Sequence, residues 1–360
     1  MIVERTCYLP KSGKFSEVLA TRRRASAVRL AEGLSAGTVF EGEIDGEPWV
    51  FWEGRFASDA EHAADLAARD ASADFAEVRA KMTTLIDQFD RVIMRPVAGP
   101  DRAVVRETDV SGLPIVPVEQ TFRSGTLSLR GFLYRPPGEG PFPLMITNHG
   151  PGIQQGTTDV CRPGVAALLM SWGIASFLPH RRGYGNSPGV PWREEIDAEF
   201  GTELYDERLT ARLDGESDDV LAALEHVSAL PEIDARHIGV MGSSFGGTVT
   251  LLAAAKTDRF RCAVEFAGAA MNWERTPLLR ETMHAAAAHL TAPVFFIQAA
   301  NDYSVRPTIE LAEGLSGASI SVQSKVYPAF GLTRDEGHFL YRDGPLIWGP
   351  DVRRFLERYL

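Results

Sequence analysis

The stretch Gly242-Ser243-Ser244-Phe245-Gly246-Gly247 lies between a short apolar run at 238–241 and an apolar, helix-forming stretch at 248–255. A strand, a sharp turn and a helix around G-x-S-x-G are the setting in which a serine acts as a nucleophile. Small residues on both sides of the serine let the strand and the helix approach, so that the Ser244 hydroxyl projects from the carboxyl edge of a sheet. The N–H of Phe245, at the helix N-terminus, then points toward a developing oxyanion. The alternative is a plain glycine-serine turn between a strand and a helix.

Two downstream residues have the types and the order that a nucleophilic serine requires, because its hydroxyl needs a base and the base needs an orienting carboxylate. Asp302 follows the buried run PVFFIQAA, and His338 follows the last strand-like stretch, KVYPAFG. Position 302 lies 58 residues after 244, which leaves room for two strand–helix units. Position 338 lies 36 residues after 302, which leaves room for one such unit. Ser244, Asp302 and His338 are therefore the expected catalytic residues.

Strand-like and helix-like stretches alternate through residues 118–360, which predicts a mostly parallel sheet with helices on both faces. The strand patterns lie at 126–134, 143–148, 174–179, 238–241, 263–266, 294–298 and 322–327, and the helical patterns at 165–172, 217–228, 248–255 and 351–360. The expected fold class is therefore α/β, preceded by a smaller α+β domain.

Residues 118–360 resemble an α/β-hydrolase, and more narrowly the branch of dienelactone hydrolases and prolyl-oligopeptidase-type enzymes. The pieces that carry the resemblance are NHGPG at 148–152, HRRGYGNSPG at 180–189, GSSFGG at 242–247, NDYSV at 301–305 and EGHF at 336–339. The resemblance implies Ser244 as the nucleophile, His338 as the general base and acid, and Asp302 as the orienting carboxylate. Asp335 and Glu336 flank the histidine, but Asp302 has the better position in the chain topology.

The resemblance also implies an oxyanion hole, with one departure from the family pattern. Phe245 supplies the first N–H, but the residue after His-Gly is Pro151, which has none. Gly152 is therefore expected to supply the second donor, with the Tyr184 hydroxyl as the alternative.

Three aromatic residues, Tyr184, Trp273 and Tyr303, are the candidate substrate contacts. Arg181 and Arg182 could bind a substrate carboxylate or hydrogen-bond their own loop, and the second role is the expected one. The sequence contains no HExxH, cysteine cluster or Walker loop, so neither a metal nor an organic cofactor is expected.

Residues 1–97 read as a separate domain with the order strand, helix, strand, strand, helix, strand. The ranges are 2–9, 14–32, 38–44, 49–56, 59–91 and 92–97, with a possible helix break at 71–72. This is the order of a ferredoxin-like, split βαβ unit, and it resembles the dimeric α+β barrel domains. The aromatic third strand (Trp49, Phe51 or Trp52, and Phe56) is expected on a sheet face that the helices leave bare. A homodimer through residues 1–97 is therefore expected, with packing on the same chain as the alternative, and 98–117 is a proline-rich linker or an irregular first strand.

The composition agrees with a folded enzyme. Of 360 residues, 44% are hydrophobic and 24% charged, which excludes disordered, collagen-like and small disulfide-stapled chains. A net charge of −11 argues against binding to nucleic acid or to an anionic membrane. Three widely separated cysteines, the absence of a signal-peptide pattern and the absence of a membrane-spanning apolar run predict a cytoplasmic protein.

The expected function is that of a serine hydrolase acting on an ester, thioester or lactone of a small molecule through an acyl-enzyme. The same residues could serve amide or C–C bond cleavage or acyl transfer. A non-catalytic binding protein on a hydrolase fold is the alternative of another class, although such a protein has no need of all three catalytic residues. The sequence leaves the identity of the substrate open.

Overall fold

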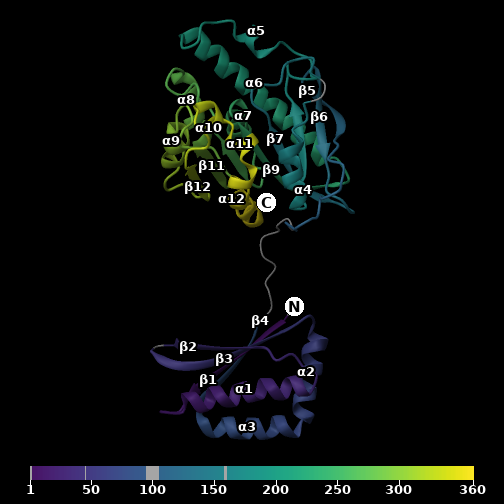
Figure 1. The fold of residues 1–360 in the computed structure, drawn as a ribbon, viewed down its shortest axis with the longest axis vertical. Helices are drawn as coiled ribbons and strands as arrows, with labels where there is room; N and C mark the ends of the chain where they lie inside the picture. Colours follow the sequence, from purple (N-terminus) through teal and green to yellow (C-terminus); the bar gives the residue numbers. More distant parts are fainter. Residues whose placement is uncertain (1, 45, 95–104, 158–159) are drawn as a thin grey trace. The chain divides into compact units, whose positions relative to one another are not determined.

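The computed structural model describes residues 2–44, 46–94, 105–157 and 160–360 (Figure 1). The chain divides into two compact units, residues 1–101 and 102–360. Residues 105–117 contain no helix or strand, but the N–H groups of Arg106 and Thr108 donate to the carbonyls of Trp172 and Ser171 at 3.0 and 2.7 Å. The second half of the expected linker is thus part of the larger unit, and its residues 98–104 lie outside the described residues.

The smaller unit is built on an antiparallel sheet with the strand order β2-β3-β1-β4. Its elements are β1 (Ile2–Pro10), α1 (Phe15–Ala31), β2 (Thr38–Ile44), β3 (Glu47–Phe56), α2 (Asp59–Ala71), α3 (Ala73–Leu85) and β4 (Ile86–Met94). This strand order and pairing are those of a split βαβ unit.

The second helical stretch of the smaller unit breaks where the sequence suggests a possible break, and it ends earlier than expected. The sequence predicts helix over 59–91 with a possible break, and the structure has two helices there, because the Ser72 hydroxyl accepts a hydrogen bond from the Phe75 N–H at 3.2 Å and starts a new helix. The last strand consequently begins at Ile86 rather than at residue 92. Residues 95–97 of the expected strand lie outside the described residues.

The two faces of this sheet differ in their side chains. Figure 1 shows α1 and α3 on one side of the sheet, and on that side Trp52 and Phe56 form a buried cluster with Ile2. Successive strand residues point to opposite faces, so Trp49 and Phe51 belong to the other side. The expectation of aromatic residues opposite the helices therefore holds for Trp49 and Phe51 and is wrong for Phe56, which lies in the core beneath the helices.

The larger unit contains an eight-stranded sheet with the order β12-β11-β10-β9-β7-β8-β6-β5, parallel from β12 to β8 and antiparallel at β6 and β5. Its elements are β5 (Val118–Ser124), β6 (Leu127–Tyr134), β7 (Phe142–Asn148), α4 (Pro163–Ser171), β8 (Ala175–His180), α5 (Trp192–Ile196), α6 (Glu203–Ser228), β9 (Ile233–Ser243), α7 (Phe245–Ala255), β10 (Ala263–Phe266), α8 (Pro277–Ala288), β11 (Val294–Ala299), α9 (Arg306–Gly314), β12 (Val322–Tyr327), α10 (Arg334–His338), α11 (Leu340–Asp343) and α12 (Pro345–Tyr359).

Both faces of this sheet are covered by helices, because its strands carry apolar side chains at consecutive positions. Ile146 and Val240 pack in one buried cluster with side chains of α6, α7 and α8. Their neighbours Met145 and Met241 pack in another, with side chains of α4 and α12. Two cores on opposite faces are what near-continuous apolar strands require, and they confirm the expected mostly parallel α/β architecture.

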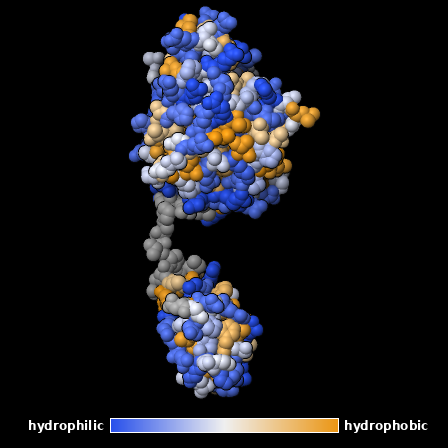
Figure 2. Space-filling view, turned by 90° about the vertical axis from the view of Figure 1, so that its left-hand side faces the viewer, coloured by the Kyte–Doolittle hydropathy of each residue, from blue (hydrophilic) through white to orange (hydrophobic). Residues whose placement is uncertain are grey.

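The molecular surface is mainly polar on the side that Figure 2 shows, with apolar groups scattered over both units. Among the described residues, none of the helices combines the length and the apolar character needed to cross a bilayer.

Candidate active site

Ser244 lies on the turn between β9 and α7, with φ 59° and ψ −125°. A positive φ is strained for a residue with a side chain, and such strain is typical of functional sites. The turn is possible because its glycines leave room. A Cβ at Gly246 would lie 2.2 Å from the carbonyl oxygen of Asn148, and a Cβ at Gly242 would lie 2.4 Å from the carbonyl oxygen of Gly246. The Ser244 N–H donates to Phe266 O at 3.0 Å, which fixes the serine at the carboxyl edge of the sheet.

The N-terminus of α7 lies directly after the serine. Phe245 is its first residue, so its N–H is among those that a helix leaves without an intrahelical acceptor. The loop after β7 lies against the same serine, since a Cβ at Gly150 would be 3.3 Å from Ser244 Cβ and 3.9 Å from Ser244 Oγ. Gly152 lies two residues further along this loop and is exposed. Its role as the second oxyanion donor stays a prediction.

His338 and Asp302 form a buried pair, with 2.9 Å between Nδ1 of the imidazole and Oδ1 of the carboxylate. Asp302 also accepts from the Tyr303 N–H at 2.6 Å and from the Gln298 side-chain amide at 2.9 Å. A carboxylate can only accept hydrogen bonds, so Nδ1 is the donor in this contact, and in the neutral imidazole Nε2 is the nitrogen with the lone pair. Nε2 is buried and has no hydrogen-bond partner among the described residues, so the bond to Ser244 is not made in this structure. Such bonds often form only in the complex with substrate.

Asn301 joins the loops that carry this pair. Its side-chain amide donates to the carbonyls of Phe330 and Thr333 at 3.0 and 2.8 Å, and its Oδ1 accepts from the Phe330 N–H at 2.8 Å. Thr333 then starts α10 with a capping box closed by Glu336, and this helix ends at His338. These hydrogen bonds hold the loop after β11 and the loop after β12 in a fixed position relative to each other.

The flanking carboxylates are engaged elsewhere. The Tyr303 hydroxyl donates to Asp335, and Glu336 accepts from the N–H groups of Leu332 and Thr333 at 2.7 and 2.9 Å. Asp302 is therefore the carboxylate that contacts His338, as the chain order predicts.

Of the three expected substrate contacts, the structure places one beside the buried pair. The Tyr303 ring meets the His338 ring edge-on at 5.7 Å. Tyr184 and Trp273 are both 0% exposed. Trp273 donates its ring N–H to Glu310 at 3.0 Å, and Tyr184 packs at 4.7 Å on the His149 ring. The substrate contacts of Tyr184 and Trp273, and the alternative role of the Tyr184 hydroxyl as an oxyanion donor, stay predictions.

Arg181 hydrogen-bonds its surroundings, as expected. Its Nε donates to Glu216 at 2.6 Å, and its terminal nitrogen donates to the carbonyl of His149 at 2.7 Å. Glu216 also accepts from Arg212 at 2.7 Å. This buried network holds the loop that lies against Ser244. His149 itself is not a candidate base, because burial, reinforced by the nearby charge of Arg181, keeps its pKa well below the ordinary range.

Glu265, in the middle of β10, is a residue that the sequence reasoning missed. It is 1% exposed and accepts from the Gly268 N–H, while its second oxygen is buried without a partner among the described residues. Burial raises the pKa of Glu265 to about 8, and the Asp302 charge adds to this effect, so the side chain holds a proton at neutral pH. The sequence did contain a signal for a buried carboxyl group, because Glu265 is an acidic residue inside the apolar run AVEF.

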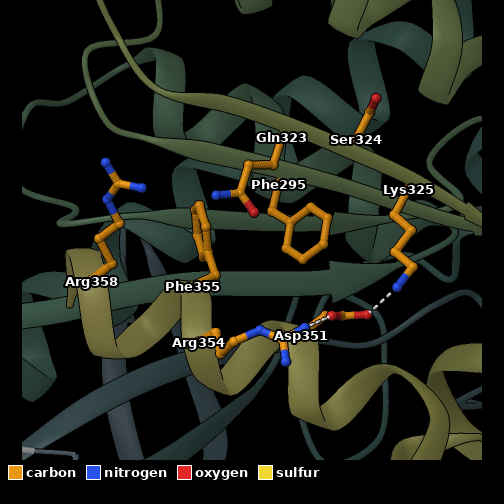
Figure 3. A pocket seen from close by; sticks show the side chains of 8 residues that line it. All are labelled: Phe295, Gln323, Ser324, Lys325, Asp351, Arg354, Phe355 and Arg358. Atoms are coloured by element: carbon orange, nitrogen blue, oxygen red, sulfur yellow. Dashed lines mark hydrogen bonds and ion pairs between the residues drawn. The ribbon is translucent and has the colours of Figure 1, made fainter.

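A separate hollow of about 390 Å³ lies where α12 packs on β11 and β12 (Figure 3). Asp351 at its rim pairs with Lys325 and Arg354. Its lining includes none of the candidate catalytic residues. Within the described ranges, no group of three or more His, Cys, Asp or Glu side chains is arranged to hold a metal ion.

Known proteins resemble the larger unit in sequence and in fold. The model of the dienelactone hydrolase family matches residues 169–342. The solved structure of the Pyrococcus horikoshii acylaminoacyl peptidase superposes on 68% of this chain and 42% of its own, with a TM-score of 0.52 at 18% identity. The larger unit has the fold of the α/β hydrolases, and its residues 169–342 are similar to the dienelactone hydrolase family.

Two curated relatives match parts of this chain. The polyketide transferase grgF of Penicillium sp is 32% identical over 209 residues, which are 56% of this chain and 63% of the relative. The quorum-quenching protein AidA of Acinetobacter baumannii (strain MDR-ZJ06) is 26% identical over 155 residues, 43% of this chain and 45% of the relative. The chain thus spans less than two thirds of the length of these relatives.

Proposed function

We propose that this protein is a serine hydrolase that cleaves an ester, thioester or lactone of a small molecule through an acyl-enzyme. The observation that carries the proposal is the buried His338–Asp302 pair, 2.9 Å apart, at the same sheet edge as a serine held at positive φ. Ser244 is the nucleophile in this proposal, His338 the general base and acid, and Asp302 the carboxylate that orients the imidazole.

In the first half-reaction, Ser244 Oγ attacks the carbonyl carbon while His338 Nε2 takes the hydroxyl proton. The carbonyl oxygen becomes an oxyanion and accepts a hydrogen bond from the Phe245 N–H, with Gly152 as the proposed second donor. The tetrahedral intermediate collapses, the bond to the leaving group breaks, and that group leaves with the proton from His338. Water then attacks the acyl-enzyme by the same route, and Ser244 regains its proton.

Each hydrogen-bond donor of the proposed oxyanion site is expected to contribute strongly to catalysis. Removing one such donor typically costs about 2.7–4 kcal/mol of transition-state stabilisation. Pro151 cannot donate, so a fast enzyme needs a second group on the loop that lies against Ser244. The buried network of Arg181 and Glu216 supports this role, because it fixes the backbone of that loop at His149.

Acyl transfer is the second candidate, favoured by the similarity to a polyketide transferase. It uses the same acyl-enzyme, and only the second half-reaction differs, since an alcohol or an amine attacks in place of water. Hydrolysis and acyl transfer therefore use the same proposed catalytic residues and differ only in the product formed from the acyl group.

A panel of acyl esters, N-acetylcysteamine thioesters and lactones, assayed with the full chain, tests the proposal. We expect turnover of at least one class, with a burst of leaving group where deacylation limits the rate. Adding a small alcohol diverts the acyl group to a new ester if transfer competes with hydrolysis. Faster turnover of peptides than of any ester would favour amide cleavage instead. A folded protein that turns over no member of the panel and forms no acyl-enzyme would favour a binding protein.

A further inference from the structure

The smaller unit holds a cavity of about 540 Å³ between its sheet and its three helices. This volume is in the range of small-molecule binding sites. Strands β1, β3 and β4 line one wall, and helices α1, α2 and α3 line the other. Apolar and aromatic side chains form much of the lining, among them Trp52, Phe75, Val78, Met82 and Phe89.

Arg22 projects from α1 into the lining of this cavity and is only 4% exposed. Among the described residues, the structure shows no hydrogen bond or ion pair to its guanidinium, and its Nε is buried without a partner. The guanidinium carbon lies 4.8 Å from the centre of the Trp52 ring, a cation–π contact. Burial lowers the pKa of Arg22 to about 10, which still leaves it charged at neutral pH.

The other buried charges of this unit already have partners. Arg29 binds Asp65, and Arg69 binds Glu4 at 3.0 Å and Asp65 at 3.0 Å. In the described part of the unit, three buried arginines therefore face two buried carboxylates, and Arg22 is the one without a counterion. An uncompensated charge in a low-dielectric interior is unfavourable, and an anionic ligand would relieve it.

Thr6 carries a second unpartnered polar group of this cavity. Thr6 lines the same cavity, and its hydroxyl is buried without a hydrogen-bond partner among the described residues. Thr6 is the cross-strand partner of Trp52, the residue whose ring Arg22 covers. A cation from the helix wall and a hydroxyl donor from the strand wall thus both lie beside Trp52. The rest of the lining combines apolar side chains with four charged ones that already have partners: Arg69 and Arg91 pair with Glu4, and Asp70 pairs with Arg79.

We propose that this cavity binds a small organic acid. Its carboxylate pairs with Arg22 and accepts from the Thr6 hydroxyl, and its aromatic or branched apolar body contacts Trp52, Phe75 and Met82. One negative charge balances Arg22, which favours a carboxylate over a phosphate dianion. The site uses no residue of the hydrolase unit and does not depend on the proposed function.

Calorimetric titration of the full chain tests the proposal. The probes are phenylacetate, 3-phenylpropionate and 2-naphthoate, each compared with its own primary amide. We expect at least one acid to bind, and its amide to bind at least about tenfold more weakly, because the amide lacks the charge that Arg22 needs. Arg22→Met should lower the affinity for the acid by at least about tenfold, and Arg22→Lys, which keeps the charge but loses the fork, by less.

The matched control is Arg24→Met, which removes an exposed arginine from the same helix and should leave the affinity unchanged. Arg22→Met is expected to unfold at or above the wild-type temperature, because it removes an unpaired buried charge. If it fails to fold, Arg22→Lys and Thr6→Val, which removes the hydroxyl, carry the same test. The proposal would be overturned if no acid binds, or if acids and amides bind equally well. Unchanged affinity in the Arg22 variants or a preference for inorganic phosphate would also overturn it.

Discussion

Nδ1 of His338 lies 2.9 Å from Oδ1 of Asp302, and both side chains are almost fully buried, at 5% and 0% exposure. The two residues come from different loops at the carboxyl ends of β11 and β12, so their contact depends on how these loops are tied together. It leaves Nε2 of the imidazole as the atom that can accept a proton. The proposed chemistry follows from this one contact and from the placement of Ser244.

The first prediction concerns this pair. His338→Ala should lower kcat/KM by roughly 10³-fold or more, since no other group can take the Ser244 proton. Asp302→Asn should cost somewhat less, because the imidazole remains but loses its preferred tautomer. Steady-state kinetics on the best ester from the panel measure both effects.

Asp335→Asn is the control for this series, because Asp335 binds the Tyr303 hydroxyl and not the imidazole. Its activity should stay within a few-fold of wild type. A damaging Asp335→Asn beside a silent Asp302→Asn would show that the orienting carboxylate has been assigned to the wrong residue.

The second prediction is that Asn301 acts as a positioning residue. Asn301→Ala removes three hydrogen bonds between the loops that carry Asp302 and His338. We expect kcat to fall roughly 10- to 100-fold with little change in KM, since a small displacement of a catalytic group is costly. Asn301→Asp keeps the acceptor for the Phe330 N–H and should retain an intermediate kcat. A purely structural role would instead lower the unfolding temperature and leave kcat of the folded protein unchanged.

The third prediction uses Glu265, whose pKa burial raises from its ordinary 4.5 to about 8. Between these two pH values the folded protein holds a proton that the unfolded chain has released, so stability falls as the pH rises through this window. Glu265→Gln cannot titrate and should escape this fall. The unfolding temperature of the variant relative to wild type should therefore rise by roughly 3 °C or more between about pH 5 and about pH 8.

The matched control for Glu265 is Glu281→Gln, which changes an exposed glutamate of α8. Its offset from wild type should be the same at both pH values. An equally constant offset for Glu265→Gln would mean that the buried carboxyl does not gain a proton on folding.

The fourth prediction is that the smaller unit forms a homodimer through the sheet side opposite its helices. The pairing register places Phe40 beside Phe51 on that side, and Phe40 is 44% exposed. Each apolar side chain buried there would contribute roughly 1.5–3 kcal/mol, and a self-complementary patch closes by two-fold symmetry. Light scattering should give twice the chain mass for wild type and a single chain mass for Phe40→Glu. Leu30→Glu, on the exposed side of α1, should remain dimeric, whereas a monomeric wild type would refute the proposal.

Local patterns were sufficient to predict the contact between Asp302 and His338 and the turn that carries Ser244. Gly242 and Gly246 mark a turn that holds Ser244 at positive φ between a strand and a helix. The position of Asp302 after a buried strand, and of His338 after the next one, places both at one sheet edge. The mostly parallel character of the sheet follows from the alternation of strand-like and helix-like stretches, because parallel neighbours need crossover connections.

Features that depend on packing between distant segments could not be predicted. Tyr184 follows a strand end, as a substrate contact could, yet it is buried against the arginine network that joins α6 to the loop after β8. Glu265 and Arg22 are charged residues in segments whose burial becomes evident only when a sheet and helices enclose them. The helix break at 71–72 was one possibility in the sequence, and in the structure the Ser72 side chain caps the second helix there.

The central claim is that Ser244 is the nucleophile, and covalent labelling with a fluorophosphonate probe tests it most directly. Intact mass and peptide mapping of the full chain should show one adduct, on the peptide that carries Ser244. Ser243→Ala should label like wild type, and Ser244→Ala should remain folded, unlabelled and without turnover. A folded wild type that stays unlabelled, or a Ser244→Ala variant that labels to the same extent, would contradict the account.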